Sequence, residues 1–161
     1  MATTPDKDSI HKELDLIQDI IKRMAQNSFQ VKGWLIGILS AIIVFEKDHL
    51  ILAGGNDKAT SLWLNVLLLL PILCFWFLDS YFLSTERLYR EVYKWVIKHR
   101  TNTNAYLFDL NTFSREINGV TEELNKPENK IRNIWYSDTL FFFYFVPILF
   151  VLALVIFNIS K

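Results

Sequence analysis

Asp79 is the residue whose chemistry is hardest to explain by ordinary packing. It directly follows Leu62–Leu78, an apolar run almost long enough to cross a bilayer. An ionisable side chain at membrane depth is costly and usually has a partner, and Lys32 at the start of another apolar run is the natural candidate. Asp79 is therefore either a gate or ion-path residue or a helix-end anchor at the membrane interface. The aromatic residues of such an interface are Trp34, Trp76, Tyr81, Trp135 and Tyr136.

Asn65 is a second polar side chain inside an apolar run. In lipid, an asparagine is stabilised either by a hydrogen bond to another helix or by water along a polar path. Both interpretations stay open for Asn65. Together, Lys32, Asn65 and Asp79 are the candidate pore or gate residues.

A row of basic residues follows Asp79. Their spacings of three, four and four residues place them within about 80° of one helix face. They are Arg87, Arg90, Lys94 and Lys98, and we call them the basic ladder. Such a row can bind anionic headgroups or a polyphosphate such as an oligonucleotide. The alternative is a solvated helix face, on which Glu86 and Glu91 form helix pairs with basic neighbours.

The remaining chemistry-bearing residues argue against an enzyme. His11, His49 and His99 are scattered, and none has a second ligand at metal spacing. A single cysteine, Cys74, excludes an internal disulfide and a cysteine-based zinc site. Glycine-rich phosphate loops and nucleophile–histidine groupings are absent from the sequence. We expect no catalytic activity, no bound metal and no cofactor.

Three apolar runs must position these residues. A membrane span needs about 20 mostly apolar helical residues to cross a hydrocarbon core about 30 Å thick. The runs are Gly33–Phe45, Leu62–Leu78 and Leu140–Phe157. They predict an all-α integral membrane protein with three transmembrane helices and long helical extensions outside the membrane.

The chain is expected to form a single membrane domain over residues 1–161, because its polar parts are too small to bury a core alone. Apolar residues at spacings of three and four predict an amphipathic helix over 9–32. The first span is expected over 33–45, and its extension to 53 stays open. The second span is expected over 62–83 and continues as a helix to about 99. A connector over 105–127 then leads to a helix over 128–157 that contains the third span.

Charge predicts the orientation. The N-terminal segment and the 84–138 loop fall on one side of a three-span protein and carry fourteen of the seventeen Lys and Arg residues. Lys47, Lys58 and Lys161 are the other three. Since basic residues resist translocation, the basic side is cytoplasmic and the C-terminus is periplasmic.

Small residues in the first span predict a face that packs on another helix, with exposure to lipid as the alternative. Gly33, Gly37 and Ala41 recur every four residues, a spacing that lets two helix backbones approach closely in lipid. Three spans are too few to enclose a pore. Any conducting path must form between copies, most simply in a cyclic homo-oligomer.

Three stretches, 21–34, 75–90 and 135–139, resemble a family of small bacterial inner-membrane proteins. The first ends in Asn-Ser-Phe-Gln-Val-Lys-Gly-Trp at 27–34, and the second begins with Phe-Trp-Phe-Leu-Asp at 75–79. The second ends in Glu-Arg-Leu-Tyr-Arg at 86–90, and the third reads Trp-Tyr-Ser-Asp-Thr. The likeness covers most of the chain except 46–61 and 105–127.

That family is similar to the membrane effectors of bacterial anti-phage systems, notably the channel-forming subunit of the Hailong system. There, a nucleotidyltransferase makes DNA oligomers that hold a membrane channel closed. The resemblance implies a homo-oligomeric channel controlled by a nucleotide or DNA-oligomer ligand and partnered by the enzyme that makes it. No binding residue is carried over by motif, but the basic ladder is one place for such a ligand. A membrane anchor that recruits a cytoplasmic defence partner is the alternative.

Overall fold

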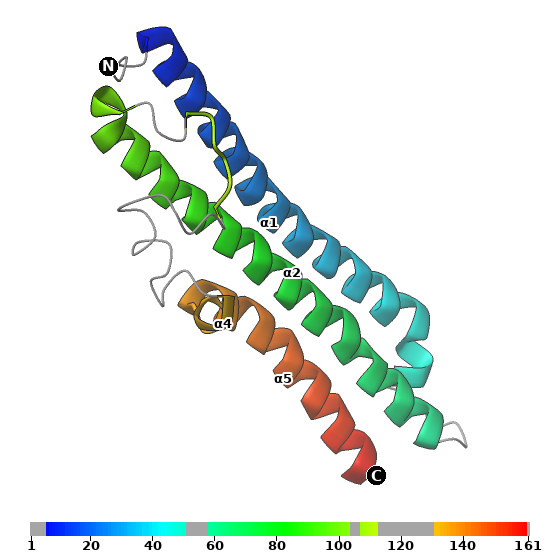
Figure 1. The fold of residues 1–161 in the computed structure, drawn as a ribbon. Coiled ribbons are helices and arrows are strands. Elements are labelled where there is room, and N and C mark those ends of the chain that lie inside the picture. Colours follow the sequence, from blue (N-terminus) through cyan, green and yellow to red (C-terminus); the bar gives the residue numbers. More distant parts are fainter. Residues whose placement is uncertain (1–5, 51–57, 104–106, 113–130, 161) are drawn as a thin grey trace. The chain divides into compact units, whose positions relative to one another are not determined.

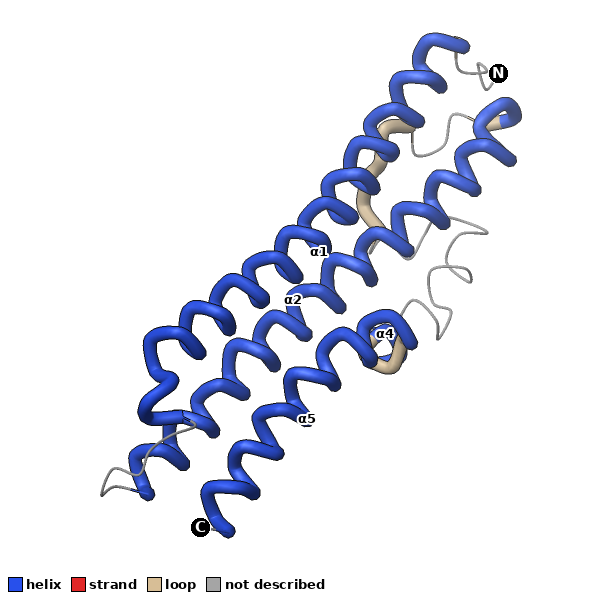
Figure 2. The backbone as a smooth tube through the Cα atoms, turned by 180° about the vertical axis from the view of Figure 1, so that it is seen from behind, coloured by secondary structure: helices blue, strands red, loops and turns tan. Residues whose placement is uncertain are grey.

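The computed structural model describes residues 6–50, 58–103, 107–112 and 131–160, and this part of the chain is helical without strands. Its elements are α1 (Lys7–Leu50), α2 (Lys58–His99), the short 3₁₀ helix η1 (Arg100–Asn102), α4 (Ile131–Ile134) and α5 (Asp138–Ser160). Figures 1 and 2 trace these helices. The predicted all-α class is confirmed.

Three of the helices are long and apolar enough to cross a membrane. These candidate spans lie in Lys7–Val44 of α1, in Asn65–Asn102, which contains most of α2, and in Asp138–Phe157 of α5. The prediction of three transmembrane helices is confirmed to this extent. Pro71 lies inside α2 and Pro147 inside α5. A proline inside a membrane helix is tolerated because neighbouring groups can satisfy the freed carbonyl.

The first two helices are longer than predicted at their outer ends. α1 is one helix through the expected ranges 9–32 and 33–45, beginning at Lys7 and ending at Leu50. α2 begins at Lys58 and continues without interruption to His99. The expected loop 46–61 therefore loses residues to both helices, while residues 51–57 lie outside the described part of the chain.

The last predicted helix, 128–157, is interrupted. α4 ends at Ile134, and α5 begins at Asp138 after a short turn. The carbonyl of Ser137 accepts the first hydrogen bond of α5, from the amide of Phe141 at 2.8 Å. Ser137 thus stands at the N-cap position, where serine is favoured, and Asp138 follows in the first turn, where a negative charge complements the helix dipole. Most of the expected connector 105–127, and the start of the predicted helix at 128–130, lie outside the described residues.

The chain divides into two compact units. Unit 1 comprises Met1–Asn27 and Tyr81–Ile134, and unit 2 comprises Ser28–Ser80 and Trp135–Lys161. α1 and α2 each contribute one part to each unit.

Unit 1 is organised around the facing apolar stripes of α1 and α2. Ile17 from α1 packs with Val92 and Val96 from α2, and all three side chains are buried. Their spacing explains the contact, because residues four apart lie on one helix face. The residues packed around this cluster include Leu14, Ile21, Tyr89, Tyr93, Trp95 and Leu110.

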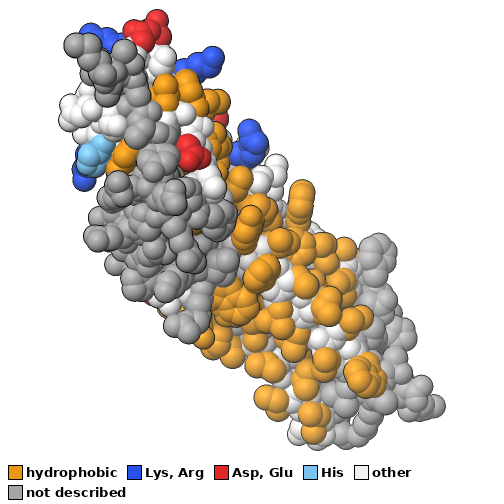
Figure 3. Space-filling view, in the orientation of Figure 1, with side chains coloured by type: hydrophobic (Ala, Val, Ile, Leu, Met, Phe, Trp, Pro, Cys, Tyr) orange, Lys and Arg blue, Asp and Glu red, His pale blue; other side chains and the backbone are white. Residues whose placement is uncertain are grey.

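Unit 2 packs parts of α1, α2 and α5 against one another. Its buried apolar residues are Val31, Leu35, Leu68, Ile72, Trp76, Leu140, Tyr144 and Val151. Large hydrophobic side chains also cover its outside, as the orange surface in Figure 3 illustrates. Among them, Trp63, Phe142 and Val146 are each more than 60% exposed, at 73%, 67% and 63%. Such an apolar exterior is stable in lipid and unfavourable in water.

Candidate functional site

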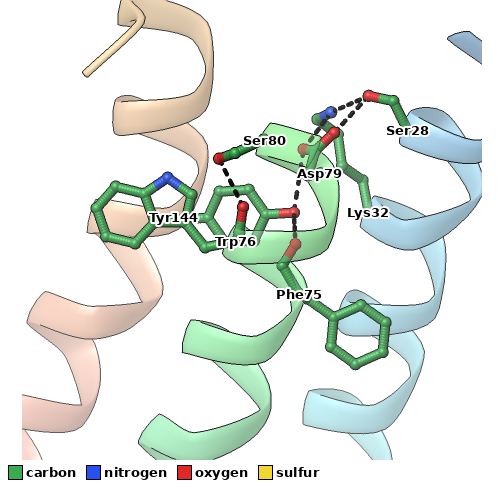
Figure 4. A network of polar contacts seen from close by, with 7 residues as sticks. All are labelled: Ser28, Lys32, Phe75, Trp76, Asp79, Ser80 and Tyr144. Carbon is green, nitrogen blue, oxygen red and sulfur yellow. Dashed lines mark hydrogen bonds and ion pairs between the residues drawn. The ribbon is translucent and has the colours of Figure 1, made fainter. Parts of the chain in front are cut away.

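The centre of the site is an ion pair inside unit 2. Asp79 of α2 is fully buried, with 0% of its surface exposed. The Nζ atom of Lys32, from α1, lies 2.5 Å from Asp79 Oδ2, and the Lys32 side chain is 23% exposed. Figure 4 shows the two side chains meeting from neighbouring helices. The structure therefore brings together the two candidate gate residues that the sequence had paired.

Two hydroxyl groups complete the surroundings of Asp79. Ser28 Oγ donates a hydrogen bond to Asp79 Oδ1 and accepts one from Lys32 Nζ at 2.9 Å. The Tyr144 hydroxyl lies 3.1 Å from Asp79 Oδ2 and 3.2 Å from the backbone oxygen of Phe75. We call Ser28, Lys32, Asp79 and Tyr144 the Asp79 network. Its members come from α1, α2 and α5, so it joins all three spans at one level (Figure 4).

Local helix geometry and ring packing position these groups. Ser28 and Lys32 are four residues apart and lie on one face of α1. The Tyr144 ring stacks on Trp76 with centroids 5.8 Å apart and an interplanar angle of 3°. Trp76 also stacks on Trp135, with centroids 5.1 Å apart. These aromatic contacts fix the direction of the Tyr144 hydroxyl toward Asp79.

The Asp79 network neutralises a charge that would otherwise be strongly unfavourable. Burying an ionised carboxylate costs several kcal/mol even after relaxation of the protein. The Lys32 ammonium balances the charge, and the Ser28 and Tyr144 hydroxyls supply further hydrogen bonds. Any movement that separates α1, α2 and α5 at this level breaks several charge-assisted contacts together.

Asn65 lies apart from the Asp79 network. It precedes Asp79 on α2 by fourteen residues, which corresponds to about 21 Å along a helix. Asn65 is 0% exposed, and within the described part of the chain neither its amide nitrogen nor its amide oxygen has a hydrogen-bond partner. Trp76 Nε1 is likewise buried and unsatisfied there. The structure therefore does not bring Asn65 together with Lys32 and Asp79.

The small-residue face of α1 points outward. Gly33, Gly37 and Ala41 are all exposed. A Cβ atom added at Gly33 or Gly37 would meet no side chain within 4 Å. Among the described residues, this face therefore does not pack on another helix of the same chain.

Part of the positive charge of the basic ladder is balanced on its own helix. In unit 1, Arg90 makes two contacts with Glu86 Oε1, at 2.8 Å from Nε and 2.6 Å from Nη2. Lys94 Nζ lies 2.7 Å from Glu91 Oε1. Arg87 is half-buried and Lys98 is exposed. The glutamates weaken the local positive field, as the helix-pair interpretation of the sequence anticipated.

A buried ion pair in unit 1 was not identified from the sequence. Arg100 and Glu13 are each only 1% exposed. Arg100 Nε donates to Glu13 Oε2 at 2.6 Å, and Nη2 donates to Glu13 Oε1. The amide of Phe108, whose φ is 61°, donates to the same Oε1 atom at 3.2 Å. This carboxylate thus holds a left-handed backbone position in place, where a bulky residue is otherwise rare.

A signal for these missed residues exists in the sequence. Arg100 follows Val92 and Val96 at intervals of four, and Glu13 precedes Ile17 by four. Both charges therefore fall on apolar helix stripes, which is the pattern of a buried pair. The position of Ser28 also has a signal in the sequence. It precedes Lys32 by four residues, so the two side chains lie on one helix face.

In the described part of the chain, no three His, Cys, Asp or Glu side chains come together in a way that could hold a metal ion. Cys74 is an exposed side chain of α2. No protein-family model matches the chain, and neither a curated protein nor a solved structure matches it.

Proposed function

We propose that this chain is the subunit of a homo-oligomeric channel of the bacterial inner membrane that acts as an effector of anti-phage defence. The observation that carries the proposal is the Asp79–Lys32 ion pair, buried where three apolar helices meet. Ionisable residues inside membrane bundles are costly, and they commonly mark ion pathways and gates.

The energetics of a buried pair favour a switching role over simple stabilisation. Well-packed apolar residues of similar volume often stabilise a protein as well as a buried ion pair does. In a bundle that opens, however, Asp79 and Lys32 gain hydration as they lose each other. The free-energy difference between the closed and open states is then small. A ligand that binds one state more tightly shifts the equilibrium toward that state. The Asp79 network holds the closed state in this scheme.

Assembly supplies the conducting path. Three spans do not enclose a pore, so copies associate in a ring. The outward face with Gly33, Gly37 and Ala41 is suited to helix–helix contact between copies, because small residues let backbones approach closely. Asn65 offers a polar group for the path once the packing around it changes.

The ligand acts from the cytoplasm in this proposal. The basic side, with the N-terminus and the 84–138 loop, is cytoplasmic, and the C-terminus is periplasmic. A nucleotide or DNA oligomer binds at the basic ladder on α2, beside the part of α1 that packs on it in unit 1. The enzyme that makes this ligand is the functional partner.

Ion flux through liposomes tests the proposal. The purified protein is reconstituted with and without short DNA oligomers, and Asp79→Asn is compared with Asp138→Asn, which changes an exposed carboxylate of the same unit. We expect flux that oligomers alter, and a change in gating or selectivity with Asp79→Asn alone. Absence of flux in every condition, from protein shown to be folded and inserted, contradicts the channel.

A membrane anchor or scaffold is the second candidate. Unit 1 exposes Leu16 on α1 and Ile97 on α2, at 40% and 55%, and in this alternative these parts of the two helices recruit the cytoplasmic partner. A partner that covers these two side chains would remove apolar surface from water. The scaffold predicts a stable complex that is weakened by Leu16→Ser and Ile97→Ser, without ion conduction.

A further inference from the structure

An apolar groove on the outside of unit 2 runs between α1 and α5. Its volume is about 360 Å³. The lining residues are Leu35, Ile36 and Leu39 from α1, and Phe142, Phe143, Val146 and Pro147 from α5. Ile36, Phe142 and Val146 are more than half exposed, at 55%, 67% and 63%, so the groove is open to the surroundings of the helix bundle.

A cationic group stands at one end of this groove. Lys32 precedes Leu35 and Ile36 by three and four residues, so it lies on the same face of α1, one turn away. Its Nζ atom lies 5.9 Å from the centroid of the Phe143 ring, which lines the groove. The groove is therefore amphipathic along its length, with apolar walls and an ammonium at its end.

Among the contacts of the described residues, the Lys32 ammonium keeps one N–H donor, and Lys32 is the exposed member of the ion pair. A lysine has three N–H donors, and two are directed to Asp79 Oδ2 and Ser28 Oγ. Asp79 is fully buried, whereas the Lys32 side chain is 23% exposed. The pair is neutral as a whole, but its exposed end is the positive one.

From these observations we infer that the groove binds an anionic phospholipid, with an acyl chain along the apolar walls and the phosphate accepting a hydrogen bond from Lys32. A basic group beside a groove between membrane helices suits such a headgroup. The walls consist of large side chains and proline, whereas helices associate in lipid through small residues. A flexible acyl chain therefore fits this groove better than a helix of a second copy, for which the small-residue face of α1 is suited.

Native mass spectrometry of the detergent-purified protein tests the inference. Phosphatidylglycerol and phosphatidylcholine with identical acyl chains are titrated separately. Both headgroups carry a phosphate, but phosphatidylcholine also carries a quaternary ammonium that Lys32 repels, so we expect phosphatidylglycerol to bind about tenfold more tightly. Equal binding of the two lipids overturns the assignment of Lys32 to the headgroup.

Two variants locate the lipid. Val146→Trp fills the groove, and the matched control Val66→Trp adds the same bulk at a 47% exposed position of α2 that does not line it. We expect Val146→Trp to lower phosphatidylglycerol binding at least about fivefold and Val66→Trp to leave it unchanged. Unaltered lipid binding by a folded Val146→Trp protein overturns the proposal. If Val146→Trp dissociates the oligomer but leaves lipid binding unchanged, the groove is a contact between copies and the proposal is also overturned.

A double variant tests the headgroup contact without leaving a buried charge unpaired. Lys32→Met with Asp79→Leu removes both charges together. The tenfold preference for phosphatidylglycerol should then disappear while binding through the acyl chain remains. Retention of the full preference in this double variant contradicts the role of Lys32. Since the readout is lipid binding, its outcome does not depend on ion conduction.

Discussion

Lys32 Nζ and Asp79 Oδ2 lie 2.5 Å apart inside a largely apolar helix bundle, and the aspartate has no exposed surface. The contact makes the packing of α1 on α2 at this level specific, because a rotation of either helix separates the charges. Ser28 and Tyr144 extend the same constraint within α1 and to α5. The site thus couples the arrangement of three apolar helices to one ionised group.

The charges of the central pair should be strongly interdependent. Lys32→Met alone leaves Asp79 buried without a counter-charge, and we expect a loss of about 3–5 kcal/mol in the free energy of unfolding. Lys32→Met combined with Asp79→Leu should recover most of that loss, because a well-packed apolar pair needs no desolvation. Denaturant unfolding in detergent measures both. Additive effects of the two substitutions would contradict the ion pair.

Tyr144→Phe should test the hydroxyl separately from the ring. The substitution keeps the stacking on Trp76 but removes a hydrogen bond to a buried carboxylate, which is worth about 1.5–3 kcal/mol. Tyr136→Phe is the matched control, because Tyr136 is 71% exposed and its change should lie within about 0.5 kcal/mol. Thermal unfolding of the two variants compares them. Equal stability of both proteins would exclude a contribution of Tyr144 to the network.

Glu13→Gln should destabilise unit 1 by about 3–5 kcal/mol, because it removes the buried carboxylate charge that accepts two hydrogen bonds from the buried Arg100. Glu91→Gln removes the same charge from the surface pair with Lys94 and should have an effect of at most about 1 kcal/mol. Hydrogen exchange of the α1 and α2 amides within unit 1 measures the difference. A similar increase in exchange for both variants would contradict the distinction between the buried and the surface pair.

Arg90→Gln with Lys94→Gln should weaken the response of the channel to DNA oligomers. The double substitution removes two positive charges and also releases Glu86 and Glu91, whose negative charges then repel phosphate. The oligomer concentration for half-maximal effect on flux should rise, and its salt dependence should become shallower.

The control for this prediction is Lys22→Gln with Arg23→Gln, which removes the same charge from exposed positions of α1 in the same unit. Its oligomer response should match that of the unmodified protein. If Arg90→Gln with Lys94→Gln leaves both the oligomer response and the assembly unchanged, the basic ladder is excluded as the ligand site.

Gly37→Ile should dissociate the oligomer without unfolding the protomer. A Cβ at this position meets nothing within 4 Å in the protomer, but a larger side chain prevents the close approach of a second helix backbone. Cys74→Ile is the control, since it enlarges another exposed side chain, on α2. Light scattering in detergent gives the mass of each assembly. An oligomer that persists with Gly37→Ile would exclude this face as the contact between copies.

The site residues that the sequence predicted are only part of the buried charged residues that the structure contains. The sequence pointed to Lys32 and Asp79, because a charge beside an apolar run is conspicuous by itself. It passed over Glu13 and Arg100, which lie in polar surroundings along the chain and are buried only because the apolar stripes of α1 and α2 meet. The position of the break before α5 was also missed, although Ser137 and Asp138 carry an ordinary helix-start signal.

The sequence by itself determined the helical class, the three spans and the faces on which the apolar residues lie. These properties depend on local quantities, namely the length of an apolar run and a period of 3.6 residues, which neighbouring residues along the chain already contain. Only the tertiary structure decided that Asp79 accepts hydrogen bonds from Ser28 and Tyr144, that Asn65 is isolated from it, and that Gly33 and Gly37 face outward. Those relationships depend on how each helix is rotated about its axis when it packs, and that rotation is set by the summed contacts of all three helices.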